Sequence, residues 1–86
     1  MPQEAFRELL PEIQLVASEA YQRASHFLER DPLLVGKNRN YLNKVACQRI
    51  RELINVGEKD VIRLANGAIT TVRQLTEQNG RFRAAA

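Results

Sequence analysis

The segment PEIQLVASEAYQRASHFLER, residues 11–30, decides the fold because its apolar side chains recur with the period of a helix. Together with the residues before it, the segment predicts one long amphipathic helix over residues 3–30. Pro11 does not fit a regular helix interior, so we expect a kink or a fresh start there. The polar face carries Glu8, Glu12, Glu19, Gln22 and His26. The apolar stripe, about 120° wide, consists of Phe6, Leu9, Ile13, Val16, Ala17, Ala20, Ala24, Phe27 and Leu28.

This helix is long for so short a chain. From residue 11 to residue 30 it would extend about 30 Å at about 1.5 Å per residue, which is more than a small fragment covers by itself. Small side chains in the middle of the stripe would let another helix approach closely. We therefore expect the stripe to form a homodimer interface, although an ordinary intramolecular core is the alternative. The predicted interface residues are Leu9, Ile13, Val16, Ala17, Ala20, Ala24 and Phe27.

Two shorter helices are predicted in the middle of the chain. Asp31 precedes a proline and should end the long helix. A second helix, capped by Asn40, should run over residues 41–54 with Leu42, Val45, Ala46, Ile50, Leu53 and Ile54 buried. Between them, Leu33, Leu34 and Val35 predict either a plug over the core or a binding patch. A third helix should follow Gly57, bury Val61, Ile62, Leu64 and Ala65, and stop at Asn66-Gly67.

A last short helix is predicted over residues 71–80, with Thr71 as its cap, Gln74 completing a capping box and Gly80 as its end. The predicted fold is thus all-α, with one long N-terminal helix and three shorter helices in an intertwined homodimer. We interpret residues 1–83 as a single helical domain, with a dimerisation helix at 3–30 and a basic helical part at 37–80. The final residues, 84–86, are all alanine and are expected to be a cloning remnant.

Composition limits the chemistry that we expect. The 86 residues are 44% hydrophobic and 6% aromatic, so few large side chains are present to surround a ligand, and a core of this size is marginal. One cysteine, Cys47, and one histidine, His26, provide neither an internal disulfide nor a zinc ligand set. The chain has no phosphate-binding glycine loop and no nucleophile elbow. We expect a non-enzymatic protein with no cofactor and no metal.

The sequence also gives an expectation about location. It contains no apolar run of about 18 residues, and its first residues do not resemble a signal peptide. We therefore expect a cytoplasmic protein without a membrane partner.

Charge is distributed unevenly along the chain. Residues 1–35 hold three arginines against six acids, whereas residues 36–86 hold ten bases against four acids. A basic half suits a phosphate-rich partner such as double-stranded DNA, or else an acidic protein. The residues that we expect to contact DNA lie in a turn (Lys37, Arg39), on the outer face of the second helix (Lys44, Arg51) and on the outer face of the third (Lys59, Arg63).

The stretch INVGEKDVIRLANG, residues 54–67, invites comparison with a helix-turn-helix motif. With Gly57 as the turn glycine, the two positions that this motif buries fall on Arg63 and Asn66, so the register fails. A frame that buries Val72 and Leu75 fits only in part. We interpret the third helix as a packed helix, and we expect DNA contact from a composite basic surface.

Two segments resemble the FlhD family of bacterial transcriptional activator subunits. They are EIQLVASEAYQRASHFLERD, residues 12–31, and IRELINVGEKDVIRLA, residues 50–65. The resemblance implies an all-helical homodimer that acts with a zinc-binding FlhC-like partner on promoter DNA, near RNA polymerase. Family members continue into a C-terminal region implicated in DNA contact, whereas this sequence ends soon after Arg83, so base reading is expected mainly from the partner. The alternative function is a helical protein-protein adaptor, antitoxin or chaperone-like, with a basic face for an acidic partner.

Overall fold

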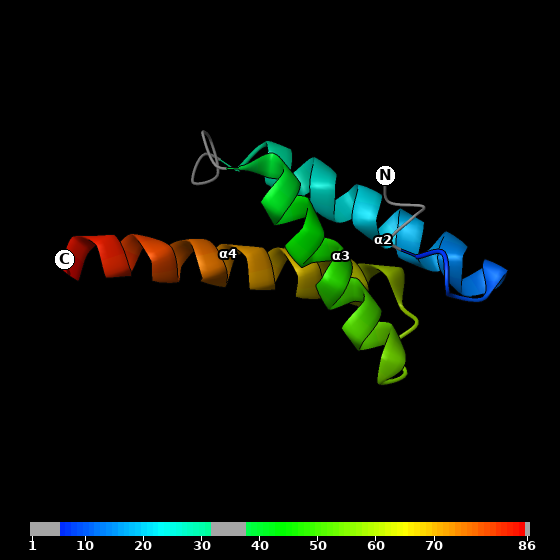
Figure 1. Cartoon of the computed structure of the whole chain (residues 1–86). Helices are drawn as coiled ribbons and strands as arrows, with labels where there is room; N and C mark the ends of the chain where they lie inside the picture. The colour runs from blue at the N-terminus through cyan, green and yellow to red at the C-terminus, as the bar shows by residue number, and fades with distance from the viewer. Residues whose placement is uncertain (1–5, 32–37, 86) are drawn as a thin grey trace.

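Three helices build the fold in the computed structural model, which describes residues 6–31 and 38–85, with side chains described as far as residue 77. They are α2 (Pro11–Glu29), α3 (Arg39–Asn55) and α4 (Val61–Ala85), and these ranges contain no strand. Each helix packs against both others. In Figure 1, α2 and α4 run in roughly the same direction and α3 crosses in front of α4, while the end of α4 projects beyond the other two helices. The all-α prediction is confirmed.

The N-terminal helix makes a fresh start at Pro11, which is one of the two outcomes predicted for that residue. Pro11 occupies the first turn of α2, where its missing N–H is not needed, and residues 6–9 form turns instead of helix. Gln14 stabilises this start, because its side-chain amide donates a 2.6 Å hydrogen bond to the carbonyl oxygen of Leu9. The predicted helix over residues 3–30 is therefore wrong for residues 6–10, while residues 3–5 lie outside the described ranges. The other end was predicted well, since α2 stops at Glu29, just before Asp31.

The α3 helix has different end residues from those predicted. Its N-cap is Asn38, not Asn40: the Asn38 side-chain oxygen accepts a 3.1 Å hydrogen bond from the backbone N–H of Tyr41. Its C-terminus closes at Gly57, which has φ 102°. The N–H of Glu58 donates to the carbonyl of Leu53 at 2.9 Å, and the N–H of Gly57 donates to that of Ile54 at 3.0 Å. This pattern is a Schellman motif, so Gly57 stops α3.

The predicted stop at Asn66-Gly67 is wrong. The chain continues as one helix of 25 residues, so α4, not the N-terminal helix, is the longest helix in the described ranges. Gly67 lies where α4 meets α3: a Cβ atom on it would be 2.5 Å from Cδ1 of Leu53. Thr71 does not cap a separate helix, because its hydroxyl donates to the carbonyl of Gly67 one turn earlier, at 2.9 Å. The described ranges thus contain three helices. The third helix and the last short helix that the sequence predicted are together the single helix α4.

The core is aliphatic and rich in alanine. The prediction that Ile62 is buried is wrong, because this residue is 58% exposed. The predicted plug or patch of Leu33, Leu34 and Val35 lies outside the described residues. Core side chains come from all three helices and from the turn before α2: Phe6, Ala17, Ala20, Ala24, Leu28, Leu42, Ala46, Cys47, Ile50, Leu64, Ala65, Ala68 and Val72.

Candidate nucleic-acid interface

The outer face of α3 carries the first pair of predicted DNA contacts. Lys44 and Arg51 are both exposed, and a spacing of seven residues, two helical turns, places them on the same side of α3. Arg51 also reaches the preceding segment, where its guanidinium lies 3.4 Å from the carboxylate of Glu8. Lys44 makes no ion pair with another described residue. The pair therefore presents one available ammonium and one guanidinium that already has an acidic neighbour.

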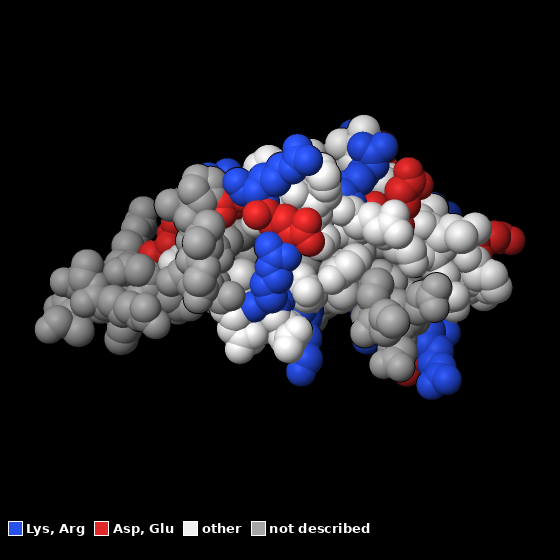
Figure 2. Space-filling model, turned by 90° about the horizontal axis from the view of Figure 1, so that it is seen from above, with Lys and Arg blue, Asp and Glu red and all other residues white. Residues whose placement is uncertain are grey.

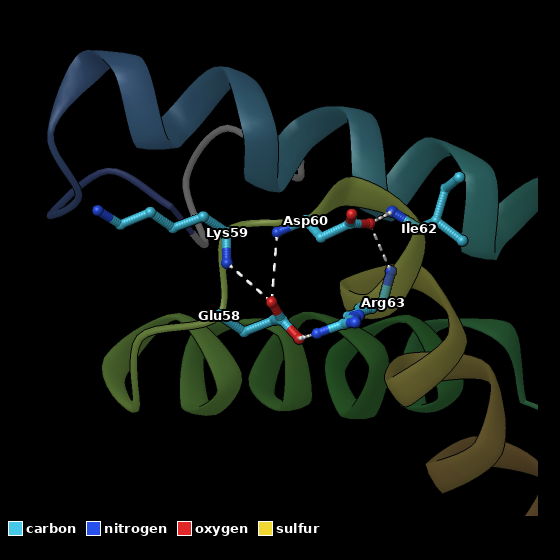
Figure 3. A network of polar contacts seen from close by, with 5 residues as sticks. All are labelled: Glu58, Lys59, Asp60, Ile62 and Arg63. Atoms are coloured by element: carbon cyan, nitrogen blue, oxygen red, sulfur yellow. Dashed lines mark hydrogen bonds and ion pairs between the residues drawn. The ribbon is translucent and has the colours of Figure 1, made fainter.

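The second pair consists of Lys59, in the turn between α3 and α4, and Arg63, in the first turn of α4 (Figure 3). The Glu58 carboxylate accepts hydrogen bonds from the backbone N–H groups of Lys59 at 3.1 Å and Asp60 at 3.4 Å. Asp60 caps α4 by accepting from the N–H groups of Ile62 at 2.8 Å and Arg63 at 3.1 Å. The two carboxylates thus hold the backbone that carries both bases.

The side chains of these two bases differ in their surroundings. Arg63 extends toward Glu58, 3.9 Å away, whereas the side chain of Lys59 points away from both carboxylates (Figure 3). Lys59 forms no ion pair within the described residues.

Of the two bases predicted in the turn before the second helix, the structure describes only Arg39. Lys37 lies outside the described residues. Arg39 begins α3, and its guanidinium lies 3.1 Å from the carboxylate of Glu29 at the end of α2. Both side chains are about half exposed, with 56% for Arg39 and 51% for Glu29. The contact therefore ties two helix ends together at the surface, where an ion pair contributes only about 0–1 kcal/mol.

Acidic neighbours thus accompany several of the predicted contacts. Arg39, Arg51 and Arg63 each lie within ion-pair distance of a carboxylate. The face of the molecule in Figure 2 shows the same mixture, with basic and acidic atoms side by side and white surface between them. Because these pairs are exposed and weak, a phosphate can replace the carboxylate at small cost. Such a surface suits a few backbone contacts that carry no sequence information.

A basic groove that the sequence analysis missed lies beside the end of α2. It has a volume of about 580 Å³ and is lined by Arg23, His26, Phe27, Arg30, Asp31 and Arg73. The Asp31 side chain is only 7% exposed, and its carboxylate lies 3.4 Å from Nε of Arg73. The spacing of Arg23 and Arg30 gives a hint of a shared helix face, but Arg73 comes from α4. No local signal predicts that contribution, because it depends on how α4 packs.

The predicted dimer stripe has two kinds of environment. Ala17, Ala20 and Ala24 are 0% exposed and belong to the core of this single chain. The structure thus gives these three alanines an intramolecular role, which the sequence analysis had kept as the alternative. Leu9 and Val16 pack on the edge of that core, Ile13 is half-buried and Phe27 is 46% exposed. A second chain at this stripe stays a prediction.

Cys47 is a buried free thiol that packs in the core as a small hydrophobic side chain. Burial raises the pKa of the Cys47 thiol above its usual value, and it also raises the pKa of the Tyr21 phenol. A thiol of this kind is protonated at neutral pH and is a poor nucleophile. Nowhere in the described residues do three His, Cys, Asp or Glu side chains gather as a metal site would require.

Comparisons with protein families, with characterised proteins and with solved structures give no match. The resemblance to the FlhD family therefore rests on the two quoted segments and stays a prediction. None of the described helices is both long enough and apolar enough to cross a bilayer. The geometry of the surface, and not a relative, is what supports a function.

Proposed function

We propose that this chain is a non-enzymatic, FlhD-like subunit of a DNA-binding transcriptional activator, and that it contacts the DNA backbone. The observation that carries the proposal is the exposure of Lys44 and Arg51 on one side of α3. In this role the subunit positions a complex on the duplex, since phosphate contacts fix orientation without reading bases. Lys59 and Arg63, both exposed, are the proposed contacts at the start of α4, and Arg39 and Lys37 complete the proposed set.

The remaining work belongs to partners. We assign base reading to an FlhC-like subunit. The assembled complex would activate transcription in the cytoplasm by contacting RNA polymerase at the promoter. The carboxylates of Glu8, Glu29 and Glu58 beside the basic residues favour a supporting role, because they lower the local positive charge. A subunit with so mixed a surface is expected to bind duplex DNA weakly and without sequence preference.

The second candidate is a helical adaptor that holds an acidic protein. It is favoured by the groove lined by Arg23, Arg30 and Arg73, whose three guanidinium groups suit acidic side chains. An adaptor of this kind shows no duplex binding even at low salt. Duplex binding therefore separates the two candidates.

The first prediction tests the α3 face. Changing Lys44→Gln and Arg51→Gln together removes two phosphate contacts, so the slope of log affinity against log salt should fall in magnitude by about two. Fluorescence titration of a labelled random-sequence duplex, repeated over a salt series, measures this slope. The matched control is the exchanged pair Lys44→Arg with Arg51→Lys, which keeps both charges and should keep the slope.

Two outcomes would count against the proposal. If the unaltered chain binds no duplex at low salt, the adaptor is the better description. If the double variant loses affinity for a promoter sequence but not for random duplex, these side chains read bases, and the positioning role is wrong.

A further inference from the structure

The solvent-facing side of α2 is acidic in its first half and basic in its second. Glu12 and Glu19 come first, and Arg23 and Arg30 follow; all four are exposed. At about 100° per residue, these four residues fall within an arc about 40° wide. They form one narrow line along the helix, on the side away from the alanines of the core. We call this line the charged arc.

The charges of the arc are largely unsatisfied within the chain. Arg23 and Glu19 approach to 3.9 Å, but their side chains are 57% and 59% exposed, so the contact is weak. Glu12 and Arg30 make no ion pair with another described residue. Apolar side chains flank the arc as well: Leu15 is 74% exposed on one side, and Phe27 is 46% exposed on the other. The charged arc and its flanks are therefore exposed to solvent, and they present both charged groups and apolar surface.

The spacing of the arc is symmetric about Tyr21. Glu12 lies nine residues before Tyr21 and Arg30 nine residues after it, while Glu19 lies two before and Arg23 two after. A two-fold axis at the level of Tyr21 would bring an antiparallel copy of α2 into register with this one. Each glutamate would then face an arginine of the other copy, and each contact would occur twice. A parallel copy would instead place like charges together.

We propose that a second copy of this chain docks on the charged arc, with the two α2 helices antiparallel. Glu12 then faces Arg30 of the partner subunit, and Glu19 faces Arg23 of the partner subunit. On the flanks, Val16 arrives at the level of the partner's Phe27, and Leu15 at the level of the partner's His26. The groove beside Arg23, Phe27 and Arg30 lies at the ends of this contact, where it leaves room for the incoming helix.

This interface differs from the predicted apolar stripe, and it is independent of DNA binding. The alanines of the stripe stay in the core of each chain, and the α3 face remains open on both copies. A helix of 19 residues is about 28 Å long, so the contact area is small. The dimer should therefore be weak. Because its charges are exposed, its dissociation constant should rise about tenfold or more between about 50 mM and about 500 mM salt.

Charge exchange between two variants provides the test. One variant carries Glu12→Arg and Glu19→Arg, so its arc is wholly basic; the other carries Arg23→Glu and Arg30→Glu, so its arc is wholly acidic. Each variant alone should sediment as a monomer at concentrations where the unaltered chain is dimeric. Mixed in equal amounts, the two should form a heterodimer at least as tight as the original dimer. The control Lys44→Glu with Arg51→Glu changes as much charge on α3 and should leave the dimer intact.

Circular dichroism of each variant establishes that α2 remains helical. If a reversed variant fails to fold, the neutral pair Glu12→Gln with Glu19→Gln should still raise the dissociation constant about tenfold. The proposal is overturned if either reversed variant dimerises alone, or if the mixture stays monomeric. Glu12 and Arg30 would then serve only the dipole of α2, since they lie at its matching ends. Failure of duplex binding would leave this result untouched, because the arc and the α3 face are separate.

Discussion

At the scale of single residues, Cys47 links burial to chemistry. Its side chain faces the core from α3 and is only 9% exposed. Because the thiolate would lose its hydration there, the folded chain keeps the proton more tightly than the unfolded chain does. Tyr21, half-buried on α2, is affected in the same direction by the same cause. Both groups therefore couple stability to alkaline pH.

The second prediction follows from the sign of these shifts. A pKa that is higher in the folded state gives stability that is complete below the unfolded value, about 8.5 for cysteine, and is lost as pH rises through the folded value. Urea unfolding at pH 7, 9 and 10 should therefore show decreasing stability, and Cys47→Ala should make the decline shallower. At pH 7 the same change should cost about 1 kcal/mol. Tyr21→Phe is the companion control, because it removes the other contribution.

If the free energy of unfolding falls equally with pH in the unaltered chain and in Cys47→Ala, the prediction is wrong. That result would mean that the thiol is as well hydrated in the folded chain as in the unfolded one.

At the scale of helices, two glycines act in opposite ways. Gly57 ends α3 because its φ of 102° lies in the left-handed region, where side chains with a Cβ are strained. Gly67 continues α4, and its missing side chain makes room for Leu53 at the crossing with α3. Gly57 is needed for its backbone conformation, and Gly67 is needed for the space that its missing side chain leaves.

The third prediction separates these two reasons. Gly57→Ala should cost about 1 kcal/mol or more, although no atom lies within 4 Å of the added Cβ. Gly67→Ala should be nearly neutral, because Ala gains up to about 1 kcal/mol of helix propensity while the end of the Leu53 side chain must move. Gly67→Leu should cost about 1–3 kcal/mol through overpacking. Thermal unfolding of the three variants measures this order, and a Gly67→Leu variant as stable as Gly67→Ala would show that the crossing is loosely packed.

The same glycines show how far the sequence predicts the helices. Periodicity identifies the positions of α2 and α3, and Pro11 and Asp31 mark the ends of α2, because these signals are local. Gly57 is also a local signal, and in the structure it ends α3. The pair Asn66-Gly67 looks equally like a stop, yet a contact with Leu53, fourteen residues earlier in the chain, decides otherwise. Tertiary packing overrides a turn signal there, and one helix replaces two.

At the scale of the whole molecule, the core depends on alanines that let helices approach. Ala17, Ala20 and Ala24 are completely buried, whereas Ile13 on the same helix is half-buried. A charge introduced at these two kinds of position therefore has different consequences. In the core it is buried by the chain itself, and at the edge it can reach water.

The fourth prediction concerns Ala20→Arg. We expect it to unfold the chain at every protein concentration, since burial of an unpaired guanidinium should cost more than the roughly 5 kcal/mol of stability expected of a small domain. Ile13→Asp should be milder, at about 1–2 kcal/mol. Circular dichroism over a range of concentrations measures both. A folded, monomeric Ala20→Arg chain would show that these alanines face a second chain, as the sequence analysis first predicted.

The candidate interface could be predicted only in outline. The sequence identifies exposed bases on α3 and at the start of α4, because exposure follows from helix periodicity. It gives no sign that Arg51 meets Glu8 or that Arg39 meets Glu29, since these contacts join separate segments. The basic groove was missed for the same reason, as Arg73 approaches Asp31 only after α4 has packed.

The turn between α3 and α4 has a consequence for the order of assembly. The hydrogen bonds that close α3 and those that open α4 all lie between Glu52 and Leu64. Contacts so close in sequence require little loop closure, so they form early in a folding reaction. The α2 helix, joined to α3 through residues 32–37, must cross a longer stretch of chain to dock. We therefore expect the α3–α4 hairpin to be the folding nucleus and α2 to dock last, so that substitutions in α2 mainly speed unfolding.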